Sequence, residues 1–409
     1  MEGRKKRLLL INSLLPYPIT QGIDARVINL LESLSRRFEV DLVCRVGSIV
    51  KFNDVPQVER YCHHVEAFLA PNRRSNLHRF VYRIIFILSS LCKGTPHDLF
   101  YNSLSGVKKK ILNLIRNNSY DIVFFEYWFW DKKLIQVANG LKVIDTNDVQ
   151  FMREGQIREQ KARSFSKPFT IFQINRYMKM ELEQLNLFDL IIATTEEDKE
   201  TFRKYLGSQK NIVFYPTGAD TDYFSLREID PEGETLIFYG AMAGFTNIDG
   251  VLHLYNDIMP LIWKKKKDVK LIVLGNNPPK EIISLTCDPR ITVTGYVQDI
   301  RDYLAKGNVV TLPLRFEYGH RGRIFEIMAM GIPIVVTPQA IKGMGLRNGE
   351  GLLIEGSPIS FAQTVLNILE DRAYAKELGL SGRKIALERF SKQATYDRLT
   401  DFLFEYLNR

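Results

Sequence analysis

The feature that most constrains the fold is a repeated alternation of short apolar runs with amphipathic segments. In the first repeat, the apolar runs 7–12 and 40–44 flank a segment with apolar residues at helical spacing, Val27, Leu30, Leu31 and Leu34. Parallel strands must be joined by a crossover, which is usually a helix. The alternation therefore predicts an α/β protein built on doubly wound parallel sheets.

Further runs of strand length fall into two groups on either side of the linker 216–218. The first group comprises 122–125, 143–144, 190–193 and 212–215, and the second comprises 236–239, 271–274, 291–294, 309–312, 334–336 and 352–354. A chain of 409 residues is also too long for one ordinary core. We predict domains over 1–215 and 216–388, and a C-terminal helix over 389–409 that packs back toward the first domain. Ligands of such sheets bind beyond the carboxyl ends of the strands, so we expect the active site in a cleft between the domains.

The net charge of +9 is concentrated near the start of the chain, because residues 1–116 carry 19 Lys and Arg against 9 Asp and Glu. This local excess indicates that one domain meets an anionic surface or acceptor. Anionic lipid and a phosphorylated acceptor both fit the charge. No recognised nucleic-acid motif accompanies it, so no nucleic acid is expected. No apolar run is long enough to span a bilayer and no secretory cleavage site follows the basic start, so we expect a cytoplasmic protein.

The segment 313–333 has the composition of an anion site. A strand end is followed by a loop with two glycines and by a short helix that starts at Arg323. The N–H groups of a helix start, with Arg321 and Arg323 beside them, suit the two phosphates of a diphosphate. Glu326 would be repelled by phosphate but would accept hydrogen bonds from ribose hydroxyls. On spacing alone, the same residues also fit surface arginines and a carboxylate that complements the helix dipole.

The string LPLRFEYGHRGRIFEIMAMGIPIVVT at 312–337 closely resembles the donor-site signature of family 4 glycosyltransferases, which have the GT-B fold. Other segments are similar to the same family, most strongly within 235–355: IFYGAM at 237, NIDG at 247, GYVQD at 295, YPTGADTDYF at 215 and LPYP at 15. The resemblance implies two Rossmann-like domains that face each other across a cleft. The N-terminal domain would bind the acceptor and the C-terminal domain the nucleotide-sugar donor.

The resemblance also implies roles for individual residues. It implies catalytic roles for Arg321 and Arg323. We add Glu317, which lies one residue from the position of a common family glutamate, and His320, which would either contact phosphate or sugar or pack within the loop. The implied donor-binding residues are Gly240, Val297, Gly319, Gly322, Ile324 and Glu326. The two arginines would bind the diphosphate, Glu326 the ribose and the backbone of Val297 the base, while Gly240 would let the main chain approach the phosphates. The implied acceptor side comprises Gly22, Glu126 and Asp148.

The reaction implied by the resemblance is transfer of a sugar from a UDP- or GDP-linked donor to a hydroxyl of a glycan or lipid-linked acceptor in cell-surface polysaccharide or glycoconjugate synthesis. The family usually retains anomeric configuration, which implies a front-face mechanism without a protein nucleophile. No tightly bound cofactor and no metal are expected. Two alternatives stay open: a nucleotide-sugar epimerase of the same fold, and a non-catalytic protein that binds an anionic surface.

Three regions depart from the family pattern. Tyr318 stands eight residues before Glu326, where a second glutamate is common. Ala241 and Asn247 occupy a region in which Arg and Lys are frequent, and the loop 145–148 lacks a common His. These departures leave the sugar contact and the acceptor geometry open.

Three further patterns each have two interpretations. The pair Asp220 and Asp222 fits either a metal motif or a capped turn, and the turn is preferred. The aromatic run 127–130 would either line the acceptor site or fill the core. The segment 80–91 with its arginines would be either a core helix or a basic amphipathic helix at an anionic membrane surface, where the protein would be peripheral.

Overall fold

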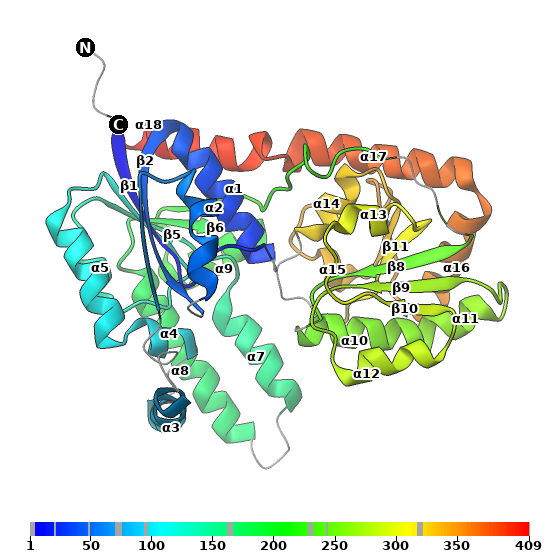
Figure 1. The fold of residues 1–409 in the computed structure, drawn as a ribbon, viewed down its shortest axis with the longest axis horizontal. Helices are drawn as coiled ribbons and strands as arrows, with labels where there is room; N and C mark the ends of the chain where they lie inside the picture. Colours follow the sequence, from blue (N-terminus) through cyan, green and yellow to red (C-terminus); the bar gives the residue numbers. More distant parts are fainter. Residues whose placement is uncertain are drawn as a thin grey trace. The chain divides into compact units, whose positions relative to one another are not determined.

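The structure is a computed structural model of the full chain, and it describes residues 5–19, 22–47, 50–69, 76–93, 97–161, 167–227, 231, 233–242, 244–316 and 322–408. The chain forms two compact units (Figure 1). The first unit comprises Met1–Pro18, Val27–Tyr215 and Leu399–Arg409, and the second comprises Ile19–Arg26 and Pro216–Arg398.

The first unit is built on a seven-stranded parallel sheet in the order β3-β2-β1-β4-β5-β6-β7. Its strands are β1 (Lys6–Ile11), β2 (Phe38–Val46), β3 (His64–Leu69), β4 (Ile122–Glu126), β5 (Leu141–Asp145), β6 (Leu190–Ala193) and β7 (Ile212–Phe214). Strand order reverses between β1 and β4, where Leu8 is paired with Val40 on one side and Ile122 on the other. The carboxyl ends at such a reversal are where doubly wound sheets bind ligands.

The helices of the first unit connect these strands. They are α2 (Pro56–Glu59), α3 (Asn76–Lys93), α4 (His97–Asn102), α5 (Ser105–Asn117), α6 (Lys132–Gln136), α7 (Gln150–Lys161), α8 (Lys167–Leu185), α9 (Glu196–Leu206) and most of α1 (Gly22–Arg37), whose first residues Gly22–Arg26 belong to the second unit. Helix α18 (Arg398–Tyr406) follows the last strand and lies in the first unit from Leu399 on. Helix α18 packs on α1 and β2, because Ser33 and Thr400 share a hydrogen bond of 2.8 Å and the rings of Phe38 and Phe404 lie 5.9 Å apart.

The second unit is built on a six-stranded parallel sheet in the order β10-β9-β8-β11-β12-β13. Its strands are β8 (Thr235–Tyr239), β9 (Lys270–Leu274), β10 (Ile291–Val293), β11 (Val309–Leu312), β12 (Ile334–Val336) and β13 (Leu353–Ile354). Its helices are α10 (Phe245–His253), α11 (Met259–Trp263), α12 (Lys280–Ile283), α13 (Ile300–Leu304), α14 (Arg323–Ala329), α15 (Pro338–Ile341), α16 (Pro358–Glu370) and α17 (Arg372–Phe390). The strand order reverses between β8 and β11, which confirms the prediction of two doubly wound parallel sheets.

Two expectations about apolar segments are resolved by burial. Trp128, Phe129 and Trp130 are buried, and the Trp128 ring packs edge-on against Tyr177 at 5.3 Å, so this part of the aromatic run fills the core. The core interpretation of 80–91 is wrong for most of its described apolar residues, because α3 leaves six large apolar side chains exposed. None of the described helices is long and apolar enough to cross a membrane.

Candidate functional site

Arg323 lies at the start of α14, and its side chain reaches the residue that follows β8. A Cβ atom built on Gly240 would lie 1.9 Å from Nη1 of Arg323. The space beside Gly240, which the sequence assigned to the approach of the donor, is therefore occupied by a guanidinium group. An alanine at this position and the observed arginine cannot both be accommodated without movement of the arginine.

Asn247 holds the same guanidinium through a hydrogen bond. Nη2 of Arg323 donates to Oδ1 of Asn247 at 2.8 Å, and Nδ2 of Asn247 donates to the carbonyl oxygen of Ala241 at 2.7 Å. The amide therefore links the arginine to the backbone that leaves β8. Sequence reasoning treated Asn247 as the loss of a basic residue and missed this positioning role.

Glu326 lies one turn into α14 and accepts a hydrogen bond from the hydroxyl of Tyr239 at 3.2 Å. Burial raises the pKa of the Glu326 carboxyl to about 7, although the hydrogen bond from Tyr239 and the charge of Arg323 both oppose this rise. Tyr239 is the last residue of β8, and its own pKa is raised well above the usual value, mainly by burial. The site thus contains a carboxyl group that changes its protonation near neutral pH.

Residues 314–316, which follow β11, are held by contacts with α10, which contains the NIDG segment 247–250. Asp249 is buried, and Oδ2 accepts a hydrogen bond from Nε of Arg315 at 2.9 Å. The rings of Phe245 and Phe316 lie 5.3 Å apart, and a Cβ atom on Gly250 would lie 2.8 Å from Leu314. The segment that resembles a family motif therefore positions both Arg323 and the end of the loop 313–316.

The other residues predicted for the donor site within 317–324 include two that the structure describes, Gly322 and Ile324. Gly322 is buried, and its carbonyl oxygen accepts the N–H groups of Phe325 at 2.9 Å and Glu326 at 3.2 Å. Ile324 is fully buried in the core of the second unit, so its side chain is structural. Four predicted residues lie outside the described part of the chain: Glu317, Gly319, His320 and Arg321.

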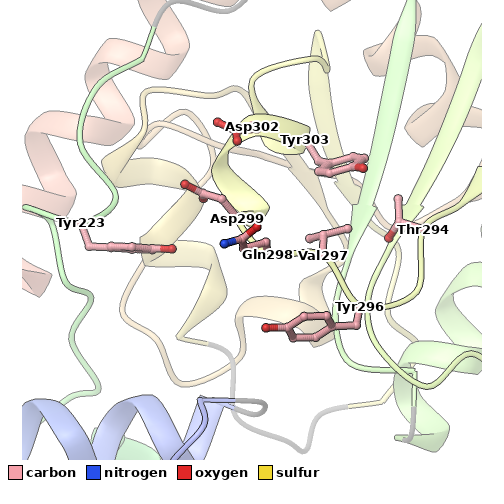
Figure 2. Close-up of a pocket in the computed structure, with 8 residues that line it drawn as sticks. All are labelled: Tyr223, Thr294, Tyr296, Val297, Gln298, Asp299, Asp302 and Tyr303. Carbon is pink, nitrogen blue, oxygen red and sulfur yellow. The ribbon is translucent and has the colours of Figure 1, made fainter. Parts of the chain in front are cut away.

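A cavity of about 670 Å³ opens beside the loop that contains Val297. Figure 2 shows Val297 and Gln298 between Tyr223 on one side and Thr294 on the other. The complete lining comprises Tyr223, Thr294, Tyr296, Val297, Gln298, Asp299, Asp302 and Tyr303. Its size suits a bound nucleoside or a similar small ligand.

Tyr223 lines this cavity and is held in place by Arg301. The guanidinium of Arg301 stacks on the ring of Tyr223 at 3.8 Å. It also donates a hydrogen bond to the backbone carbonyl oxygen of Tyr223 at 2.8 Å, so two contacts fix this residue. Tyr223 is also among the groups that raise the pKa of Tyr239, the hydrogen-bond partner of Glu326. Tyr223 was not predicted as a site residue, because it follows the linker and has no spacing that distinguishes it from a packing residue.

The acidic pair before Tyr223 forms a capped turn, as predicted. Oδ1 of Asp220 accepts the N–H groups of Asp222 at 3.2 Å and Tyr223 at 2.9 Å. Oδ2 of Asp220 accepts a hydrogen bond from Nζ of Lys392 at 3.0 Å. These contacts give Asp220 a structural role in orienting the residues that lead to Tyr223.

In the first unit, Glu126 and Asp145 end the neighbouring strands β4 and β5 and are paired in register. Both side chains are fully buried. Nδ2 of Asn147 donates to Oε2 of Glu126 at 2.9 Å, and the Asn147 carbonyl accepts a hydrogen bond from Thr194 at 2.7 Å. Asn147 has a φ of 58°, in the left-handed region that Asn tolerates better than most residues. Glu126 therefore lies beneath a loop that it helps to hold.

Asp148 is half-buried at the edge of this loop. Its Oδ2 lies 3.5 Å from Nε2 of Gln150 and 3.9 Å from Nη1 of Arg153. Tyr127 is close enough that Asp148 contributes to its raised pKa, which is caused mainly by burial. The first unit thus collects polar groups at the carboxyl ends of β4 and β5.

Glu181 fixes the helix that follows this loop. Its two carboxylate oxygens accept the N–H groups of Gln150 at 3.1 Å and Phe151 at 2.7 Å, at the start of α7. Burial raises the pKa of Glu181 to about 8. The third predicted acceptor residue, Gly22, belongs to the second unit, in a segment where Arg26 donates to Thr217 at 3.1 Å.

The two doubly wound parallel sheets form a GT-B fold. Residues 233–371 match the family model of glycosyl transferases group 1, so this part of the chain is similar to these enzymes and supports a glycosyltransferase.

Two relatives illustrate the sequence similarity. An uncharacterized 44.6 kDa protein in the cps region of Klebsiella pneumoniae is 20% identical over 411 residues, which cover 96% of this chain and 98% of that protein. The capsular polysaccharide biosynthesis glycosyltransferase CapM of Staphylococcus aureus is 25% identical over 167 residues, which cover 39% of this chain and 44% of CapM.

Solved structures share the fold at lower identity. The lipopolysaccharide glycosyltransferase WaaG has a TM-score of 0.66 at 12% identity and covers 97% of this chain and 99% of its own. Anabaena HepE with UDP and glucose has a TM-score of 0.63 at 13% identity and covers 98% and 99%. Staphylococcus aureus TarM, in a complex that contains UDP, has a TM-score of 0.68 at 12% identity and covers 99% and 100%.

Proposed function

We propose that the chain transfers a sugar from a UDP- or GDP-linked donor to a hydroxyl of a glycan or lipid-linked acceptor in surface-polysaccharide synthesis. The observation that carries the proposal is the joint placement in the second unit of Glu326 and of Arg323, which occupies the space beside Gly240 and is held by Asn247. Similarity to CapM, whose name refers to capsular polysaccharide biosynthesis, and to structures that contain UDP supports it.

Donor binding would divide between charged and aromatic groups. Arg323 and Arg321 would hold the diphosphate, because guanidinium groups form charge-assisted, bidentate contacts with phosphate oxygens. The ionised carboxylate of Glu326 would accept hydrogen bonds from the ribose hydroxyls. The backbone of Val297 would bind the base, and the rings of Tyr223 and Tyr296 in the cavity suit stacking against it.

The chemistry would rely on stabilising the charge of the departing diphosphate. As the bond between sugar and phosphate breaks, the arginines would neutralise the growing negative charge in a preorganised site. The sugar would pass through an oxocarbenium-like state, and a phosphate oxygen would accept the proton of the incoming hydroxyl on the same face. This sequence gives retention, which the anomeric proton of the product would report by NMR.

The other residues of the segment 317–324 would also contact the donor, and the first unit would bind the acceptor. Glu317 and His320 would contact the sugar or phosphate, and the backbone at Gly319, Gly322 and Ile324 would follow the donor. Asp148 would face the acceptor hydroxyl, with Glu126 as a positioning residue beneath Asn147 and with Gly22 on the acceptor side. The basic start of the chain would bring the first unit to the cytoplasmic face of an anionic membrane.

Nucleotide binding tests the proposal most directly. We expect UDP or GDP to raise the Tm by several degrees at saturating concentration, since a ligand at about 100 times its Kd stabilises a fold by about 2.7 kcal/mol. ADP serves as the comparison base, and the nucleotide with the largest shift identifies the donor. If none of the three changes the Tm, the proposed function is wrong.

The affinity for the donor is expected to depend on pH through Glu326. Its pKa near 7 leaves mostly the neutral acid at pH 6 and mostly the carboxylate at pH 8, and only the carboxylate accepts both ribose hydroxyls. Affinity for UDP-glucose, whose diphosphate does not titrate in this range, should therefore fall about tenfold from pH 8 to pH 6. The Glu326→Gln variant should bind more weakly and without this dependence; an unchanged pH profile in the variant would remove Glu326 from donor binding.

A further inference from the structure

Helix α3 (Asn76–Lys93) presents a continuous apolar surface. Six large side chains are between 43% and 63% exposed: Phe80, Val81, Ile84, Ile85, Ile87 and Leu88. At 100° per residue these positions occupy one arc of about 160° around the helix, and no buried side chain lies within it among those of residues 78 and 80–89, which the structure describes. Single exposed apolar residues are ordinary, whereas a contiguous apolar patch indicates a binding surface.

The opposite side of α3 holds the helix to the first unit. The ring of Phe86 lies 5.7 Å from Phe100 and 6.2 Å from Tyr101, on helix α4. Phe86 falls outside the exposed arc on the helical wheel, so this contact turns the arc away from the protein. Figure 1 shows α3 low in the first unit, below α4, with which it is in contact.

The charged residues of α3 indicate which kind of surface the apolar arc binds. The helix contains Arg79, Arg83 and Lys93 and no Asp or Glu. Arg83 is exposed and lies next to the edge of the apolar arc. A helix with an apolar face, basic residues and no acidic ones is complementary to anionic lipid headgroups above acyl chains.

We propose that α3 is a membrane-docking helix that inserts its apolar arc into the interface of an anionic lipid bilayer. With 18 residues it is about 27 Å long and lies along the membrane surface, as its attachment to α4 through one side requires. This inference deepens the proposed function and rests on the part of it that brings the first unit to a membrane. It adds the element responsible and a hydrophobic contribution to binding.

Co-sedimentation of the full chain with vesicles tests the docking helix. We expect binding to phosphatidylcholine vesicles that contain phosphatidylglycerol, and a decrease of about tenfold or more in partitioning for the variant Ile84→Gln with Leu88→Gln. Gln is a good helix former, and both side chains are exposed, so the fold should be preserved. The matched control, Leu380→Gln with Leu387→Gln, changes two similarly exposed residues on α17 and should partition like the wild type.

A second variant separates insertion from electrostatic attraction. Phe80→Trp adds an exposed indole on the arc, whereas Trp128 and Trp130 are buried. Its emission should shift to the blue on anionic vesicles and be quenched by brominated lipids, and part of the shift should persist in high salt because apolar insertion is not screened.

Three results would overturn the proposal: no partitioning to anionic vesicles, equal partitioning of the α3 variant and the wild type, or a wild-type dimer that the α3 variant dissociates. The last result would show that a second copy covers the arc. Stabilisation by UDP or GDP is measured for every variant and should not change. A wild-type protein that partitions to anionic vesicles but is not stabilised by UDP or GDP would instead contradict the proposed sugar transfer and leave the docking helix supported.

Discussion

Replacing Arg323 by alanine is expected to lower kcat/KM for donor hydrolysis by about 100- to 1,000-fold, because a charge-assisted contact to the leaving diphosphate contributes about 3–4 kcal/mol to the transition state. Arg323→Lys should recover part of the loss, since lysine keeps the charge but not the planar fork. Release of the nucleoside diphosphate from a UDP- or GDP-sugar measures both. Arg389→Ala, which removes an exposed arginine from α17 of the same unit, serves as the control and should leave the kinetics unchanged.

Gly240→Ala provides an independent route to the same loss. The new Cβ would displace Nη1 of Arg323, which is the end of a flexible side chain, so the arginine moves while the fold is kept. The free energy of unfolding should change by less than about 1 kcal/mol. Because both changes act on one group, the double variant should be hardly slower than Arg323→Ala alone. Additive losses would show that Gly240 serves the donor directly and that the arginine is not its target.

The two wound sheets were predictable because buried parallel strands have continuous apolar sequences. β4 and β6 are buried at every residue, and their predicted and observed bounds differ by at most one residue. β3 was missed, since it is half exposed and its apolar run is broken by His64 and Glu66. An edge strand with one partner lacks the burial that makes the pattern visible.

The candidate site was predictable only where residues carry their own chemistry. Arg323 and Glu326 follow from spacing at a helix start, and the structure places both beside the end of β8. Asn247 was missed because its role depends on an arginine 76 residues later in the chain. Tyr223 was missed because its position beside Val297 depends on how the linker runs past α13.

A second neighbouring glycine is expected to respond differently from Gly240. Gly275 follows β9, and a Cβ built there would lie 1.9 Å from the carbonyl oxygen of Gly240. Backbone cannot move aside as an arginine side chain can, and the N–H of Gly240 is already bonded to the carbonyl of Leu274 at 2.9 Å. Gly275→Ala should therefore separate the ends of β8 and β9 and lower the free energy of unfolding by about 1–3 kcal/mol.

The comparison of the two glycines distinguishes a contact that serves the site from one that serves the fold. Gly275→Ala should lower the Tm by several degrees and also weaken nucleotide binding, because the backbone that carries Gly240 moves with β8. Gly356→Ala, at a position where a Cβ meets no atom within 4 Å, is the matched control and should keep both properties. A Gly275→Ala protein with normal Tm and normal nucleotide binding would mean that the two strand ends are not packed as closely as the structure describes.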